Sequence, residues 1–154
     1  MSESLWHFAL WLYRQPDVED LCLELQDRHG ADVPLLLCYA WLDSRGQALA
    51  PALHEHLERE ATRWQNEIIS PLREARRAMK RETDIEPLRE RVKACELEAE
   101  KALLERFESL VSHAQTLAAP DHSLCHQYLN QLGVNGDKQQ TSLALLQKTD
   151  EFRV

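Results

Sequence analysis

The chain has 154 residues, a length that favours a single domain. Hydrophobic residues make up 44% of it and charged residues 29%, a balance typical of a folded, soluble protein rather than a disordered one. The 18 basic and 26 acidic side chains give a net charge of −8, which argues against general nucleic-acid binding because such surfaces are basic. No apolar run approaches the roughly 20 residues of a membrane span, and the four glycines are too few for a many-turned β-barrel or sandwich.

The amino terminus and the cysteines indicate the compartment. The sequence starts Met-Ser-Glu-Ser without a basic region, and His7 interrupts the apolar stretch that follows, so a secretory signal is not expected. The four cysteines are far apart and form no Cys-x-x-Cys pair. We therefore expect a cytoplasmic protein with reduced thiols.

Apolar residues recur at helical spacing through most of the chain, which predicts an all-α fold. Three short helices are expected in the amino-terminal third. The third of them, at residues 35–42, is apolar on almost every face and should lie at the centre of the core. The expected caps and stops are Ser4 and Pro16 for the first helix, Asp17 and Gly30 for the second, and Asp32 and Gly46 for the third.

Two much longer helices are expected next. One begins near Ala50, and its apolar stripe runs to Met79 without losing phase at Pro71. Pro71 must kink this helix or restart it with Ser70 as the cap, and the continuous stripe favours one kinked helix. The other runs from Ile85 to Leu117 after a turn at 83–84, so the pair forms an antiparallel hairpin that reaches roughly 45–50 Å.

The carboxy-terminal part carries a weaker pattern. We expect residues 1–134 to form a single-domain helical bundle, with the three short helices packed on the long kinked hairpin, and residues 135–154 to be a polar loop with a short helix or flexible tail. Within this part, Asp121 is expected to cap a short helix that Gly133 stops, residues 135–140 to form a loop, and Thr141 or Ser142 to open a last helix.

A basic helical face is the first candidate for function. Its five cations have i, i+3, i+4, i+7, i+8 spacing, which places them within an arc of about 140°. They can be a solvated face paired with Glu82, Glu86 and Glu90 or with the acidic amino-terminal third, a surface for an acidic partner protein, or a site for a phosphate-bearing ligand or RNA. The five residues are Arg73, Arg76, Arg77, Lys80 and Arg81.

A pocket between the amino-terminal helices and the segment 64–77 is the second candidate. Asp32 is explained as a helix cap, but Asp27 lies late in its helix, where the helix dipole disfavours an anion. It therefore pairs with a cation or has a role in a site. The possible pocket residues are Asp27, Asp32 and Trp64, and Arg73 and Arg77 would add cations for an anionic ligand.

Metal and nucleophile patterns are weak. His122, Cys125 and His126 share a helical face, and His54, His56 and Glu58 form a loose cluster, but neither set has the four ligands of a closed zinc site. Cys22 and Cys38 lie on apolar faces, as inert core cysteines do. No catalytic residue, metal or cofactor is therefore expected, which favours a protein that is not an enzyme and leaves an enzyme as the alternative.

Several segments together resemble a known family. They are Leu5-Trp6 with Tyr13, Leu23-Glu-Leu-Gln-Asp-Arg-His-Gly-Ala-Asp-Val, Leu35-Leu-Leu followed by Trp41-Leu, and Trp64 with Pro71-Leu-Arg-Glu-Ala-Arg-Arg-Ala-Met-Lys. They resemble an uncharacterised family of small all-helical proteobacterial proteins, a domain of unknown function. The resemblance covers roughly residues 5–80 and implies a bacterial, cytoplasmic helical protein without assigning a catalytic residue. Pro34 stands where a polar residue is expected, but it fits the first turn of a helix.

These observations lead to two functional hypotheses. The first is a non-catalytic protein–protein interaction or regulatory module. Three short helices are hard to stretch over a hairpin of this length, so its far end either bundles with a second copy or presents a surface to a protein partner. The second is a small-molecule binding protein, or an enzyme of unknown type, with its pocket near Asp27, Trp64 and Arg73. Nucleic acid and membrane are not expected partners.

Overall fold

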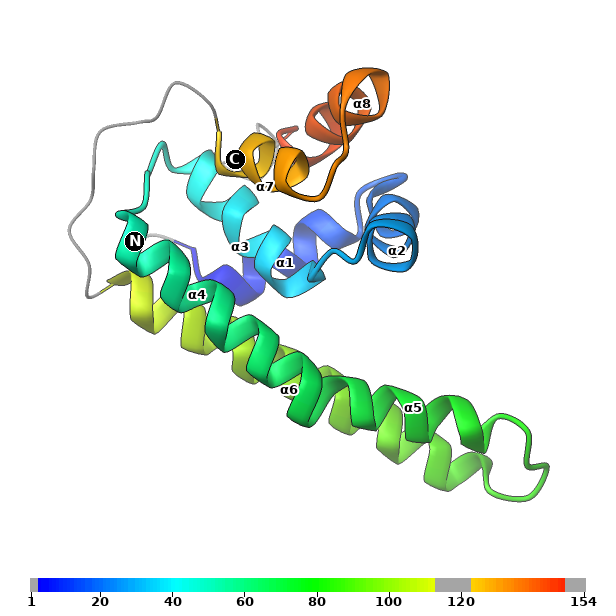
Figure 1. Cartoon of the computed structure of the whole chain (residues 1–154). Helices are drawn as coiled ribbons and strands as arrows, with labels where there is room; N and C mark the ends of the chain where they lie inside the picture. The colour runs from blue at the N-terminus through cyan, green and yellow to red at the C-terminus, as the bar shows by residue number, and fades with distance from the viewer. Residues whose placement is uncertain (1–2, 113–122, 149–154) are drawn as a thin grey trace.

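A computed structural model describes residues 3–112 and 123–148, and within them the fold is all-α, as the sequence predicts (Figure 1). The long hairpin forms one layer, and the shorter helices pack along one side of it. The elements in chain order are α1 (Leu5–Tyr13), α2 (Val18–His29), α3 (Val33–Ser44), α4 (Pro51–Trp64), a π-helical turn (Gln65–Ile69), α5 (Ser70–Met79), α6 (Glu86–Ser112), α7 (Leu124–Gln131) and α8 (Gly136–Leu146).

Helix α3 lies at the centre of the core, which confirms the prediction from its apolar composition. Every residue from 34 to 42 is buried. The buried side of α1, which carries Phe8 and Leu12, packs against α3. Helix α7, which is distant in the sequence, also packs against α3. Because a helix with no polar face cannot remain in water, the surrounding helices are arranged around α3.

The predicted hairpin is present, and Pro71 does not break it. The helical path runs from Pro51 to Met79, and the backbone of Ser70 is helical (φ −62°, ψ −42°), so Ser70 is not a cap. The Ser70 N–H instead donates to the carbonyl of Gln65, five residues back. This π-helical turn lies just before the proline and absorbs the disruption of normal helical bonding that proline causes.

The hairpin extends beyond the rest of the domain. Figure 1 shows α5 and the start of α6 continuing past α2 to a free tip. No residue of α5 is buried, and in the first half of α6 only Glu96 is. We call residues 70–79 and 86–102 the arm. Leu72, Met79 and Val92 of the arm are half-buried, so apolar packing holds the arm together only in part.

Most of the predicted caps are confirmed. The Ser4 hydroxyl accepts from the His7 N–H at 3.1 Å, the Asp32 carboxylate accepts from the Leu35 N–H at 3.1 Å, and Gly30 ends α2 with φ +70°. Asp17 differs, because its side chain makes no capping bond. Its backbone is left-handed (φ +70°), which turns the chain from α1 into α2.

The carboxy-terminal helices begin at other residues than predicted. Ser123, not Asp121, caps α7, since its hydroxyl accepts from the His126 N–H at 3.0 Å. Helix α8 begins at Gly136, so most of the predicted 135–140 loop is helical, and the prediction that Thr141 or Ser142 opens it is wrong. Lysine and glutamine are good helix formers, and Asp137 suits the first turn. Asp121, His122, Leu117 and the last six residues of the segment 135–154 lie outside the described residues.

Asp43 joins the two ends of the chain. Its two carboxylate oxygens accept from the backbone N–H groups of Leu124 and Cys125, at 2.8 and 3.0 Å. Asp43 belongs to the end of α3 and the two amides to the start of α7. One side chain thus satisfies two of the free donors at a helix start that is far away in the sequence.

Within residues 3–112 and 123–148, none of the helices has both the length and the apolar character needed to cross a lipid bilayer.

Replacing Asp43 by alanine should lower the free energy of unfolding by about 1–2 kcal/mol, because two N–H groups lose their acceptor. Urea denaturation measures the loss, and hydrogen exchange at the Leu124 and Cys125 amides should accelerate. Asp27→Ala, which removes an exposed carboxylate of α2, is the matched control and should change little. Equal stabilities for the two variants would contradict the role of Asp43.

Candidate functional site

A cleft of about 570 Å³ lies between the amino-terminal helices and the arm. Its volume falls within the range of about 300–1,000 Å³ that is usual for ligand sites. One wall comes from α1, α2 and α3 and is mostly apolar, whereas the wall from α5 and α6 carries most of the charge. The lining includes Trp6, Tyr13, Glu19 and Leu23 on the first wall, and Arg73, Arg76, Arg77, Glu90, Lys93, Glu96, Leu97 and Glu100 on the second.

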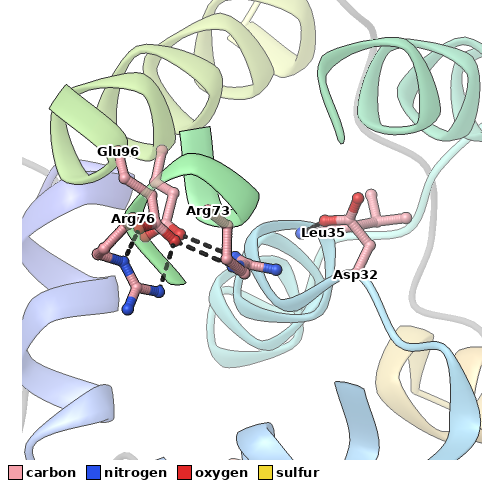
Figure 2. A network of polar contacts seen from close by, with 6 residues as sticks. Asp32, Leu35, Arg73, Arg76 and Glu96 are labelled. Atoms are coloured by element: carbon pink, nitrogen blue, oxygen red, sulfur yellow. Dashed lines mark hydrogen bonds and ion pairs between the residues drawn. The ribbon is translucent and has the colours of Figure 1, made fainter. Parts of the chain in front are cut away.

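A compact charge cluster joins the two helices of the arm, as Figure 2 shows. The carboxylate of Glu96 accepts from Arg73 Nε at 2.9 Å and from Arg76 Nε at 2.5 Å. Arg73 also reaches Glu100, with 3.4 Å between Nη2 and Oε1. Glu96 is only 7% exposed, so one buried carboxylate of α6 holds two guanidinium groups of α5. The two arginines are neutralised inside the molecule before any ligand arrives.

The ionisation of the cluster follows from burial and pairing. Burial raises the pKa of Glu96, but hydrogen bonds and charge from Arg76 and Arg73 outweigh it and hold the pKa below its ordinary value. The hydrogen bond to Glu96 raises the pKa of Arg76. The pKa of Glu100 is raised, chiefly by burial, because Arg73 offsets that burial only in part. Glu96 is therefore the permanent anion of the cluster.

Asp32 adds a third carboxylate to the surroundings of Arg73. Burial raises its pKa from 3.8 to about 6, although the Leu35 N–H, Gln65 and the charge of Arg73 all act to lower it. Its own backbone N–H donates to the Tyr128 hydroxyl at 2.8 Å. Figure 2 shows Asp32 on the far side of Arg73 from Glu96. The cap of α3 is thus coupled electrostatically to the arm.

Two aromatic residues of α1 face the cleft. The pKa of Tyr13 is raised to about 12, chiefly by burial and to a smaller extent by nearby groups that include Glu19 and Glu100. Its phenol therefore remains a neutral hydrogen-bond donor at neutral pH. The ring of Trp6 lies 5.6 Å from the Lys101 ammonium, a cation–π contact. This wall therefore offers flat apolar surface together with one hydroxyl group.

Two leucines face the cleft and remain exposed to water. Leu23 of α2 is 41% exposed and Leu97 of α6 is 52% exposed, and they belong to opposite walls. Isolated exposed leucines are ordinary, but two that flank the same cleft make an apolar surface that a ligand or partner can cover.

The predicted basic face is divided between three environments. Arg73 and Arg76 belong to the charge cluster, and Arg77 lines the cleft without an ion pair among the described residues. Lys80 and Arg81 are exposed near the tip of the arm and do not line the cleft. The acidic partners that the sequence suggested, Glu82, Glu86 and Glu90 or the amino-terminal third, are not those that bind Arg73 and Arg76, since the antiparallel hairpin places Glu96 and Glu100 opposite these arginines.

The predicted pocket residues do not assemble around Arg73. Asp27 is exposed on α2, and Trp64 is half-buried on α4, with the Arg106 guanidinium 5.4 Å from its ring centre. Neither residue lines the cleft. Of the three predicted pocket residues Asp27, Asp32 and Trp64, only Asp32 is linked to the cleft, through the charge of Arg73 on its carboxyl group.

The cysteines divide into buried and exposed thiols. Burial raises the pKa of the Cys22 thiol to about 12 and also raises the pKa of Cys38 and Cys125, which makes all three poor nucleophiles. Cys95 is exposed on α6. Among the described residues no three or more His, Cys, Asp or Glu side chains are grouped to hold a metal ion. The two histidine clusters considered above include His122, which lies outside the described residues.

The sequence interpretation missed the residues that dominate the cleft. From the sequence, Glu96, Glu100 and Lys93 received no role, and Leu97 lies off the main apolar stripe of its helix. One signal could have located Glu96. In an antiparallel hairpin, residues at equal distances on either side of the turn lie opposite one another. With the turn at 83–84, the position opposite Arg73 lies within about one helical turn of Glu96.

The raised pKa of Asp32 predicts a specific pH dependence. Between its ordinary value of 3.8 and its folded value of about 6, the folded protein binds a proton that the unfolded chain does not. The ionised carboxylate therefore destabilises the fold above pH 6, and this penalty disappears as the pH falls toward 4. Asp32→Asn keeps a capping oxygen without the charge, so it should raise the free energy of unfolding at pH 7.5 by up to about 3 kcal/mol.

Urea denaturation of native protein and Asp32→Asn between pH 4 and pH 8 tests this prediction. The advantage of the variant should shrink with falling pH and vanish near pH 4. Asp84→Asn, at the exposed turn of the hairpin, is the control and should follow the native curve. Parallel curves for native protein and Asp32→Asn, or a less stable variant at pH 7.5, would contradict the burial of an ionised Asp32.

Comparison with known proteins identifies a family but not an activity. A family model described as "Protein of unknown function (DUF2390)" matches residues 4–107, which include α1 to α5 and most of α6 and hence both walls of the cleft. No curated protein and no solved structure matches the chain. The match covers more than half of the chain, and it confirms the resemblance to an uncharacterised family. The chain belongs to the DUF2390 family of proteins of unknown function.

Proposed function

We propose that this protein is a non-catalytic interaction module whose cleft binds an apolar, acidic segment of a partner protein. The observation that carries the proposal is the pair of exposed leucines, Leu23 and Leu97, on opposite walls of the cleft. A partner that inserts apolar side chains between them would remove both from water, at about 25 cal/mol for each Å² of apolar surface buried.

Charge indicates the chemistry of the partner. The two arginines of the cluster are engaged by Glu96, whereas Arg77 and Lys93 on the same wall form no ion pair with the described residues. Of the remaining acidic groups of the cleft, Glu100 lies 3.4 Å from Arg73, Glu90 lies 3.8 Å from Arg89, and Glu19 belongs to the opposite wall. Carboxylates of a partner are therefore the groups that the α5–α6 wall can attract.

The shape of the site supports a short segment as the occupant. A cleft of about 570 Å³ holds a few large side chains and not a folded domain. The aromatic rings of Trp6 and Tyr13 form a flat wall, and aromatic residues are enriched where proteins bind one another. The internally paired cluster fixes the opposite wall before binding, so less ordering entropy is lost when the partner binds.

A small anionic molecule is the second candidate, and the ligand-sized volume of the cleft favours it. Arg77 would be its principal contact, because Arg73 and Arg76 would first have to release Glu96. This candidate predicts that citrate or inorganic phosphate raises the melting temperature of the native protein and not that of Arg77→Gln.

We further propose that the protein is bacterial and resides in the cytoplasm. The four free cysteines suit a reducing compartment.

Selection of random displayed peptides on the native protein alone tests the interaction function. We expect enriched peptides that combine large apolar residues with aspartate or glutamate. Their affinity, measured by fluorescence anisotropy, should fall at least about tenfold with Leu23→Asp, Leu97→Asp or Arg77→Glu.

Leu88→Asp is the matched control, because Leu88 is 41% exposed, like Leu23, but does not line the cleft. It should leave peptide affinity unchanged. Peptides that bind Leu97→Asp as well as they bind the native protein would contradict the proposal. Stabilisation by citrate or phosphate that depends on Arg77, with no enriched peptide, would favour the second candidate.

A further inference from the structure

The side of α6 that faces away from the cleft carries a regular exposed stripe. Its five residues follow one another at alternating spacings of three and four, the heptad pattern of a helix that packs against another helix. All five are exposed, and Leu88 is 41% exposed. The residues of this outer stripe are Leu88, Arg91, Cys95, Glu98 and Ala102.

Helix α5 continues the same face. At 100° per residue, Pro71, Ala75 and Ala78 lie opposite the side of α5 that carries Arg73, Arg76 and Arg77 into the cleft. All three are exposed and have short side chains. Small side chains allow another helix to approach closely. The arm thus has two different sides, one toward the cleft with the paired charge cluster and an outer one that combines small and apolar side chains with Arg91 and Glu98.

The charges of the outer stripe complement each other under a two-fold axis. Arg91 and Glu98 are seven residues apart, about 10 Å along the helix, and neither forms an ion pair with the described residues. If a second α6 packs antiparallel on the first with the axis beside Cys95, each Arg91 faces Glu98 of the other copy. The same register places each Leu88 opposite Ala102, so a large side chain meets a small one.

We propose that two copies of this protein associate through the outer stripes of their arms, antiparallel and with Cys95 beside the two-fold axis. The occupant of this face is a second copy, because the charge pattern is complementary to itself, as an isologous interface requires. The two hairpins then form a four-helix arrangement that covers the arm. The cleft lies on the other side of α6 and stays open, so the dimer does not depend on the proposed partner binding.

Sedimentation equilibrium over a concentration series tests the register by charge exchange. Arg91→Glu and Glu98→Arg each place like charges opposite one another twice, so each should weaken dimerisation about tenfold or more. The double variant Arg91→Glu/Glu98→Arg restores opposite charges and should regain native affinity. Lys93→Glu, an equivalent charge reversal on the cleft side of α6, is the control and should dimerise like the native chain.

Cross-linking with a short bismaleimide tests the position of the axis. Cys95 is the exposed cysteine, whereas the other three are buried, so the native protein should yield a covalent dimer and Cys95→Ser should not. A native protein that stays monomeric up to its solubility limit would overturn the proposal, as would a double variant no better than the single ones. Leu97→Asp should lose peptide binding and still dimerise, so a failure of one proposal does not conceal the other.

Discussion

The shared ion pair of Glu96 with Arg73 and Arg76 is the interaction on which the arm and the cleft depend. Helix α5 has no fully buried residue, and its apolar side chains Leu72 and Met79 are only half-buried, so apolar packing supports its position on α6 only in part. A single carboxylate, 7% exposed, receives both guanidinium groups, and Glu100 adds a weaker contact. A buried charge left without its partner is costly. The ion pairs of Arg73 and Arg76 with Glu96 therefore hold α5 against α6, and the same side chains form the charged wall of the cleft.

The rest of the domain provides a rigid base for that arm. Helix α3 is buried on every side, and Asp43 at its end ties down α7 through two backbone amides. Asp32 at its start lies within the electrostatic reach of Arg73. Asp32 thus couples the core to the cluster electrostatically. This arrangement gives the arm one side with paired charges and apolar walls, suited to a partner segment, and another side with a self-complementary stripe.

The sequence predicts the parts of the fold that depend on local pattern. Residues 35–42 showed a central helix through the absence of a polar face, and the stripe that keeps phase across Pro71 showed one continuous helical path. The π-helical turn at Gln65–Ile69 was not predictable, because it depends on how the preceding helix adapts to the proline.

The candidate site is harder to predict from the sequence than the fold, because it too depends on contacts between separate helices. Arg73 and Arg76 were recognised as a cationic face, but Glu96 belongs to another helix and only the register of the hairpin brings it to them. From the sequence, Asp27 is an anion late in α2, where the helix dipole disfavours negative charge. In the structure its carboxylate is exposed to water, which explains how it is tolerated there without a site.

The dependence of the arm on Glu96 is tested most directly by a double-mutant cycle. The free energy of unfolding is measured for native protein, Glu96→Gln, Arg76→Gln and the double variant, with hydrogen exchange of the α5 amides followed in each. We predict that the two single effects are not additive, with a coupling energy of about 1–3 kcal/mol, and that α5 exchanges faster in both single variants. Effects that add to within about 0.5 kcal/mol, with unchanged protection of α5, would show that the arm is held by something other than this carboxylate.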